Sequence, residues 1–178
     1  MNPIELIDKY CEGNAELRKV LYVHSKMVAE LALRLAQRHP ELHLDEQFLY
    51  EAAMLHDIGI VRTDAPGIHC HGTEHYLRHG LLGGEILRQE VLPRHARVAE
   101  RHTGTGLTPK SIVEQNLPLP PLDLTPETLE EQLICYADKF YSKTHLEKEK
   151  SYESARRSLL RFGEDGVEVF DRWHRMFG

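Results

Sequence analysis

Four histidines occupy positions where the surrounding pattern calls for an apolar side chain. They are His24, His56, His79 and His102, and His56 is followed directly by Asp57. A polar side chain turned toward a core must find a hydrogen-bond partner, a counter-charge or a metal, because burying it unsatisfied costs on the order of 2–7 kcal/mol. One such histidine is more often a core residue bonded to a backbone carbonyl. Four of them in one small chain indicate a common site.

The helices that must position these side chains can be located from apolar periodicity. The 3, 4 spacing of one helical face predicts one helix for each of the four histidines. These helices span residues 14–38, 45–58, 79–90 and 94–103. We expect Gly59 to adopt the left-handed backbone conformation that ends a helix, which places His56 and Asp57 in the last turn of their helix.

A fifth predicted helix brings another carboxylate toward the same interior. We expect it to begin at Thr125 as N-cap, with Pro126 at the first helical position. Asp138 shares or borders its apolar face. Inward-pointing side chains from several helices are how a bundle builds a metal site. Four imidazoles and two carboxylates suit Fe, Mn, Zn, Ni or Co better than Ca, and the lack of cysteine ligands argues against a structural zinc site.

The order of these residues resembles the signature of the HD-domain metal-dependent phosphohydrolases. That signature is a histidine in one helix, an adjacent His-Asp pair in a later helix and a distant aspartate. The matching residues here are His24, His56, Asp57 and Asp138. The resemblance covers about residues 17–145 and implies an all-α fold, the HD-domain helical bundle.

The sequence His-Asp-Ile-Gly at 56–59 and the intervening His79-Gly80 and His102-Thr103-Gly104 resemble the members of the family that hold two metals. The resemblance implies one metal on His24, His56, Asp57 and Asp138 and a second on Asp57, His79 and His102. Asp57 adjoins a ligand of the first metal and is the natural bridge, so it is the expected catalytic carboxylate. Two divalent transition-metal ions are therefore expected, Fe or Mn first, with Zn, Ni, Co and Mg as alternatives.

Four further residues are candidates for contacting the substrate. Many relatives carry a lysine after the glycine of the motif, whereas this chain has Ile60 there and Arg62 as the first basic residue. Arg62 and Lys139 could orient a phosphate, or simply be solvated charges. His69 and His71 lie in the loop before His79 and are candidates for a proton donor in a lid, with a polar surface loop as the alternative.

The remaining histidines and the cysteines carry no predicted chemistry. We interpret as surface or capping residues His39, His43, His95, His145 and His174. Three cysteines without a framework spacing favour a reducing compartment. No apolar stretch is long enough to span a membrane and no signal peptide is evident, so we expect a cytoplasmic protein.

The length and net charge of the chain indicate its domain organisation and the class of its partner. The chain has 178 residues and reads as a single domain over 1–178, with a C-terminal helical extension at 151–177 divided by Gly163. The apolar stripe Phe170, Trp173, Met176 and Phe177 favours core packing, with a homodimer contact as the alternative. A net charge of −6 argues against general nucleic-acid or membrane binding, so the expected partner is a small phosphorylated molecule, foremost a nucleotide.

The expected activity is hydrolysis of a small phosphate ester or anhydride by a metal-activated hydroxide, with the break at 103–124 as a lid or pocket wall. Two alternatives stay open. One is a mononuclear 5'-nucleotidase-type enzyme that uses only His24, His56, Asp57 and Asp138. The other is a non-catalytic module that senses a nucleotide.

Overall fold

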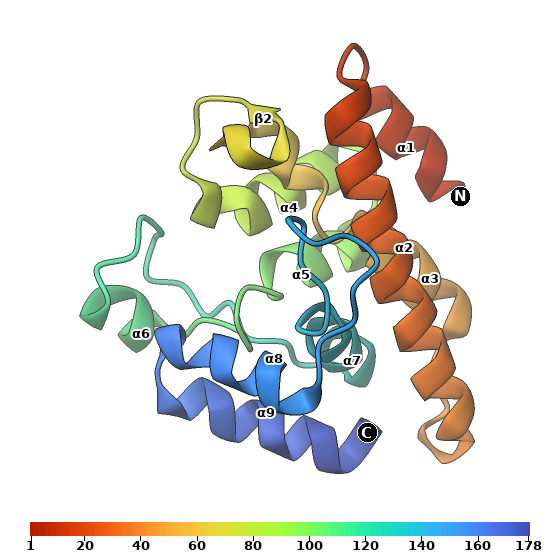
Figure 1. The fold of residues 1–178 in the computed structure, drawn as a ribbon, viewed down its shortest axis with the longest axis vertical. Helices are drawn as coiled ribbons and strands as arrows, with labels where there is room; N and C mark the ends of the chain where they lie inside the picture. The colour runs from red at the N-terminus through yellow and green to blue at the C-terminus, as the bar shows by residue number, and fades with distance from the viewer.

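The computed structural model describes residues 1–178 and is built almost entirely of helices (Figure 1). The α-helices are α1 (Pro3–Tyr10), α2 (Ala15–Arg38), α3 (Glu46–Leu55), α4 (His79–Gln89), α5 (Pro93–Glu100), α6 (Pro109–Glu114), α7 (Leu129–Asp138), α8 (Tyr152–Leu159) and α9 (Glu164–Phe177). Two short antiparallel strands, β1 (Asp64–Ala65) and β2 (Cys70–His71), lie between α3 and α4. The predicted all-α class is confirmed.

The long helix α2 organises the bundle. It packs against α3 and α7, and α4 packs against α5. Their apolar faces join in one core of 39 buried residues, to which α8 and α9 contribute as an antiparallel pair beside α7 (Figure 1). Phe170, Trp173 and Phe177 of α9 are buried in this core, so the C-terminal stripe packs within the chain as the core interpretation predicted. None of the helices has the length and apolarity needed to cross a membrane.

The start of α7 corrects the prediction made at Thr125. The helix begins three residues later, after Thr128, whose hydroxyl accepts a hydrogen bond from the backbone N–H of Glu131 at 3.1 Å. The Glu131 carboxylate accepts in return from the N–H of Thr128 at 3.3 Å. This reciprocal capping satisfies two N–H groups that a start at Pro126 would leave open, which is why the helix starts there.

Gly59 also acts differently from the prediction. The chain runs from α3 through His56 and Asp57 into a short 3₁₀ segment, Ile58–Arg62, and Gly59 is not among the residues with positive φ. A Cβ at this position would overlap the backbone of His79 and of Gly83 in α4. Glycine is needed here because α4 approaches the chain at Gly59 too closely for any side chain.

Two histidines are less exposed than predicted. His95 is buried, because it belongs to the apolar row of α5 that faces α3. Its Nε2 lies 3.2 Å from the Glu51 carboxylate and its ring packs edge-on against Phe48 at 5.0 Å between centroids. His174 is half-buried, with Nδ1 2.7 Å from the Tyr136 hydroxyl.

Candidate metal centre

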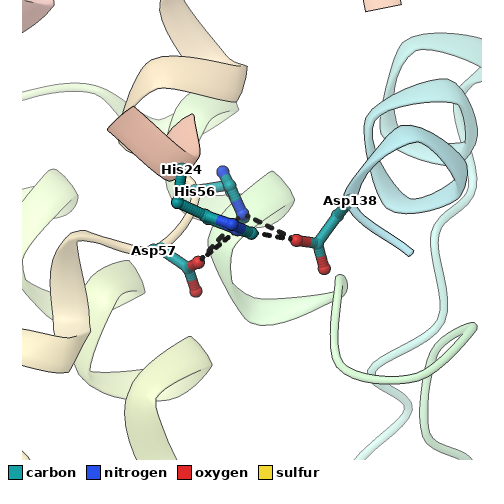
Figure 2. Close-up of side chains that lie close together, drawn as sticks. All are labelled: His24, His56, Asp57 and Asp138. Atoms are coloured by element: carbon teal, nitrogen blue, oxygen red, sulfur yellow. Dashed lines mark hydrogen bonds and ion pairs between the residues drawn. The ribbon is translucent and has the colours of Figure 1, made fainter. Parts of the chain in front are cut away.

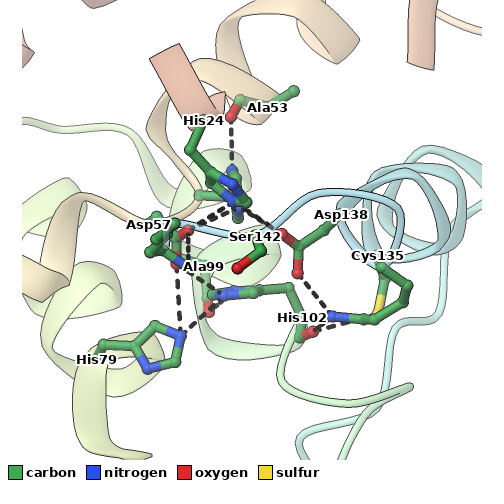
Figure 3. Close-up of polar contacts among 12 residues, drawn as sticks. His24, Ala53, Asp57, His79, Ala99, His102, Cys135, Asp138 and Ser142 are labelled. Atoms are coloured by element: carbon green, nitrogen blue, oxygen red, sulfur yellow. Dashed lines mark hydrogen bonds and ion pairs between the residues drawn. The ribbon is translucent and has the colours of Figure 1, made fainter. Parts of the chain in front are cut away.

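Six predicted ligand side chains meet at one buried point between the helices, four of them labelled in Figure 2 and five in Figure 3. His24 lies in the middle of α2, His56 caps the C-terminus of α3 and Asp57 follows it; the others are His79, the first residue of α4, His102, two residues beyond α5, and Asp138, the last residue of α7. All six are buried. Five of the six lie at or just beyond a helix end, and His24 projects from the middle of the long helix α2.

The first group consists of His24, His56, Asp57 and Asp138 (Figure 2). The Nε2 of His24 lies 3.0 Å from Oδ1 of Asp138 and 3.1 Å from Oδ2 of Asp57. The Nε2 of His56 lies 3.3 Å from Oδ1 of Asp138 and 3.1 Å from Oδ2 of Asp57. Figure 2 shows both imidazoles between the two carboxylates. Two nitrogens and two oxygens thus point at one small volume.

The second group consists of Asp57, His79 and His102. Here Oδ1 of Asp57, the oxygen that does not face the first group, lies 3.1 Å from Nε2 of His102 and 3.4 Å from Nε2 of His79. The two Nε2 atoms are 3.0 Å apart. Asp57 therefore joins the two groups, with one oxygen in each.

Backbone hydrogen bonds fix the protonation of three of the rings. The Nδ1 atoms of His56, His79 and His102 lie 2.6, 2.7 and 2.7 Å from the carbonyl oxygens of Ala53, Tyr76 and Ala99. A carbonyl can only accept, so each Nδ1 carries a hydrogen, and Nε2 presents a lone pair whenever the ring is neutral. A hydrogen bond from the other ring nitrogen to a backbone carbonyl is typical of metal-binding histidines.

The orientation that follows suits a cation at both groups. The lone pairs of His79 and His102 face each other and cannot form a hydrogen bond between them. In the first group, Nε2 of His56 is fully buried, and its contacts there are with carboxylate oxygens. Oδ2 of Asp57 is also fully buried, and its contacts are with the two imidazoles at 3.1 Å and with one ammonium group, that of Lys143. Two buried carboxylates and several imidazole nitrogens that converge in this way form a nitrogen and oxygen donor set, so the residues present fit divalent cations in both groups.

The electrostatics of the rings agree with this arrangement. Burial, with His102 beside it, lowers the pKa of His79 to about 3, so the ring is neutral at physiological pH. Burial also lowers the pKa of His56, but Asp57 and Asp138 outweigh it and raise that pKa to about 10. A cation binding to the first group must therefore displace a proton from His56.

Two lysines balance the carboxylates. Lys143 Nζ lies 2.6 Å from Oδ2 of Asp57, and Lys139 Nζ lies 2.6 Å from Oδ2 of Asp138. Burial raises the pKa of Asp57, but Lys143 and His56 hold it well below its usual range. Lys143 was not singled out from the sequence, because it lies in the irregular segment after α7, where no periodicity marks a side chain as inward-facing.

Two hollows open from this centre. The larger, of about 680 Å³, is lined by Asp138, Lys139 and Lys143 at the metal centre and by residues of the C-terminal segment. The smaller, of about 410 Å³, reaches His79 and His102 and is walled by residues of the 103–124 segment, Thr103, Gly104, Gln115 and Leu117. The predicted pocket wall in this segment is therefore present.

Of the four predicted substrate contacts, the structure brings only Lys139 to the hollows. Arg62 is half-buried in the 3₁₀ segment and its guanidinium lies 3.2 Å from the Glu85 carboxylate. His69 lies 3.2 Å from Glu16 of α2, and His71 is exposed on β2. Substrate contacts by Arg62, His69 or His71 would require the loop to move, and they stay predictions.

The chain matches one protein-family model and is similar in sequence to several archaeal proteins. A family model described as the HD domain matches residues 21–143. An uncharacterized protein of Methanocaldococcus jannaschii is 39% identical over 65% of this chain and 62% of its own length. Two proteins named tRNA (cytidine(56)-2'-O)-methyltransferase are 34% identical over 67% of the chain, from Picrophilus torridus, and 31% identical over 85%, from Thermoplasma volcanium. The matches cover 30% and 40% of those two proteins. The chain thus spans less than two thirds of each relative.

Solved structures show the same fold. The HD domain of the phosphodiesterase PgpH from L. monocytogenes matches with a TM-score of 0.57 and 18% identity, over 92% of this chain and 92% of that domain. Its complex with cyclic-di-AMP matches with a TM-score of 0.57 over 93% and 91%. The similarity confirms the predicted HD-domain bundle.

Proposed function

Because this chain belongs to the HD domain family, we propose that it is a metal-dependent phosphohydrolase that acts on a small phosphate ester or anhydride. The observation that carries the proposal is the facing pair of His79 and His102. The two Nε2 atoms are 3.0 Å apart, and their lone pairs repel each other unless a cation is bound to both. A second cation beside the first group is the arrangement that favours phosphate hydrolysis.

In this proposal, the side chains around the two ligand groups position the cations and attract the phosphate. Two divalent cations, Fe or Mn in this proposal, would supply positive charge to phosphate oxygens and lower the pKa of water. Asp57 ties the two ligand groups together and so sets their spacing. The Nδ1 to carbonyl bonds hold the imidazoles in place before substrate arrives. Lys139 and Lys143 line the larger hollow, where their ammonium groups would attract phosphate oxygens.

We propose a nucleotide as the substrate. The two hollows, about 680 and 410 Å³, are of the size of small-molecule sites. The rings of Tyr76 and Phe162 line both and offer apolar faces for a base. The PgpH HD domain, which has the same fold, binds the nucleotide cyclic-di-AMP. Dinucleoside polyphosphates and mononucleotides are the first compounds to test.

A second candidate is a phosphate ester on an RNA end. It is favoured by the two relatives named tRNA methyltransferases, whose similarity to this chain covers 30% and 40% of their length. A short 2'- or 3'-phosphorylated oligonucleotide represents this substrate class in the same screen. Hydrolysis of the oligonucleotide but not of any nucleotide would favour this candidate.

The test begins with metal analysis of protein purified without chelator or nickel resin. Metal-free protein is then reloaded with Mn, Fe, Zn, Ni, Co or Mg and assayed for phosphate release from the nucleotides, the oligonucleotide, a phosphodiester and an aryl phosphate. We expect hydrolysis with Mn or Fe, abolished by chelator and by Asp57→Asn. Asp64→Asn, an exposed aspartate of β1, is the matched control and keeps its activity.

Two outcomes would replace the proposal. Tight binding of a nucleotide without hydrolysis of any compound would identify a sensor module. Anomalous scattering from one cation, with His79 and His102 beyond coordination distance, would identify the mononuclear enzyme.

A further inference from the structure

We propose that the C-terminal segment completes the substrate pocket and that Lys150 and Arg161 bind a second anionic group of the substrate, one that is not hydrolysed. This inference rests on the proposed function. It concerns a part of the chain that lies beyond the 21–143 match to the HD domain model. The substrates it favours carry at least two phosphate groups.

The turn between α8 and α9 and the first turn of α9 are held by hydrogen bonds against the 103–124 segment. The carbonyl oxygen of Phe162 accepts a hydrogen bond from Nε2 of Gln115 at 2.9 Å. The carbonyl oxygen of Gly166 accepts from the hydroxyl of Thr105 at 3.1 Å. A Cβ on Gly104 would lie only 3.3 Å from the Phe162 ring, so the ring is seated directly on that loop. The segment is therefore held over the pocket, not merely near it.

Four cationic side chains line the larger hollow, in a chain whose net charge is −6. They are Lys139, Lys143, Lys150 and Arg161. The only acidic residue in the lining is Asp138, which belongs to the first ligand group. A concentration of one charge in a concave site, against the net charge of the molecule, is typical of a site for an anion.

The four cations fall into two pairs with different surroundings. Lys139 and Lys143 are each ion-paired with a carboxylate of the ligand groups, at 2.6 Å in both cases. Lys150 and Arg161 line the same hollow but form no salt bridge in the structure. Arg161 lies over the Phe162 ring, with its guanidinium carbon 4.7 Å from the centroid. The first pair belongs to the reacting phosphate, and the second is free to bind another group.

The backbone hydrogen bond of Lys150 and the charges around it also support an anion site. Its N–H donates to the carbonyl of Phe140 at 2.8 Å, which ties the lysine to the end of α7. Burial lowers the pKa of Lys150, Asp138 raises it, and the positive charges of Lys139 and Arg161 lower it further. The cations are thus close enough to repel one another. An anion bound between Lys150 and Arg161 relieves that repulsion.

The test measures binding of inorganic tripolyphosphate to metal-free protein by calorimetry, which needs no turnover. We expect the Lys150→Gln/Arg161→Gln double variant to bind roughly tenfold more weakly or worse, the effect of losing charge-assisted hydrogen bonds. The matched control is Lys148→Gln/Arg157→Gln. It removes the same charges from exposed positions of the same segment that do not line the larger hollow, and it should bind as the wild type does.

Equal binding by the wild type and the Lys150/Arg161 double variant would overturn the inference, and so would an equal loss in both double variants. With a hydrolysed nucleotide, we expect the Lys150/Arg161 variant to raise KM for a triphosphate more than for a monophosphate. If no compound is hydrolysed but tripolyphosphate binding still depends on Lys150 and Arg161, the proposed function fails and the anion site stands. If nucleotides are hydrolysed and tripolyphosphate binding is unchanged, only the anion site fails.

Discussion

At the scale of single residues, Asp57 is the most constrained group in the molecule. It is completely buried, its two oxygens face different ligand groups, and one of them also contacts Lys143. The lysine supplies the positive charge that the carboxylate needs when no cation is bound. This makes the contribution of Lys143 to stability dependent on metal.

We expect Lys143→Met to destabilise the metal-free protein by about 3 kcal/mol, because it leaves a buried carboxylate without its partner. Cations that occupy the ligand groups would take over that role, so the loss should shrink when metal is present. Urea unfolding with chelator and with Mn measures both values. Lys148→Met, on the exposed part of the same segment, is the control. Equal losses with and without metal would contradict this account.

The second ligand group predicts a change in metal content. We expect two cations per wild-type chain and one in His79→Ala or His102→Ala, because each substitution removes a ligand from the second group and leaves the first intact. Elemental analysis of protein reloaded with Mn and desalted measures the ratio. His71→Ala, an exposed histidine of the preceding loop, should keep both cations. An unchanged ratio in the first two variants would rule out this ligand assignment.

The sequence could predict the meeting of the six ligand residues because each breaks an apolar pattern or borders one. His24 in the row of α2 and Asp138 at the end of α7 are visible for that reason. Lys143 and Arg161 could not be found in this way. Lys143 lies in an irregular segment and Arg161 in the short 3₁₀ turn Leu160–Phe162, and their positions depend on how α7, α8 and α9 pack in three dimensions.

At the scale of elements, the sequence predicts helices better than their ends. Helix α2 follows the predicted 14–38 closely, with Asn14 as its N-cap. The start of α7 was misplaced because Thr125-Pro126 and Thr128 both look like helix starts. The Glu131 side chain that decides between them acts only once the turn has formed. The sequence predicted that Gly59 ends the helix, because the close contact between the 3₁₀ segment Ile58–Arg62 and α4 is a tertiary property that no local pattern shows.

That contact can be tested with one methyl group. We expect Gly59→Ala to destabilise the protein by about 1–3 kcal/mol, the usual cost of overpacking, because the added carbon overlaps the backbone of His79 and Gly83. Since His79 is a ligand residue, metal content should fall as well. Gly67→Ala, where a Cβ meets nothing within 4 Å, is the control. Thermal unfolding and elemental analysis of both variants provide the measurements, and equal behaviour would refute the close-contact explanation.

The packing of α5 on α3 predicts a pH dependence. Burial lowers the pKa of His95, with Arg94 and the N-terminus acting in the same direction, while Glu51 opposes them. The unfolded chain therefore binds a proton at a higher pH than the folded one. As pH falls below about 6.5, the free energy of unfolding decreases, by at most about 1.4 kcal/mol per pH unit for one group.

We expect this part of the decrease to be absent in His95→Gln. Urea unfolding of the wild type and His95→Gln between pH 7 and 5, with chelator present, measures the contribution of His95. The other histidines contribute equally to the two profiles. His145→Gln, exposed after α7, should follow the wild type. Parallel pH profiles for the wild type and His95→Gln would contradict the prediction.

At the scale of the whole molecule, the proposed ligand residues come from α2, α3, α4, α5 and α7 or from positions just beyond their ends, so bound cations would tie these five helices together. A cation bound there binds the folded chain and not the unfolded one. At 100 times its Kd, one such ligand adds about 2.7 kcal/mol to the free energy of unfolding. For a chain of this length, that corresponds to a rise in Tm of roughly 5–10 °C.

We therefore expect Mn to raise the Tm of metal-free protein by that amount and chelator to reverse the rise. His71→Ala, which removes an exposed histidine, should leave the rise intact, whereas Asp57→Asn should remove most of it because Asp57 belongs to both groups. Differential scanning calorimetry of the three proteins makes the comparison. The same rise in Asp57→Asn would mean that the cation stabilises the chain from somewhere other than the point where the five helices meet.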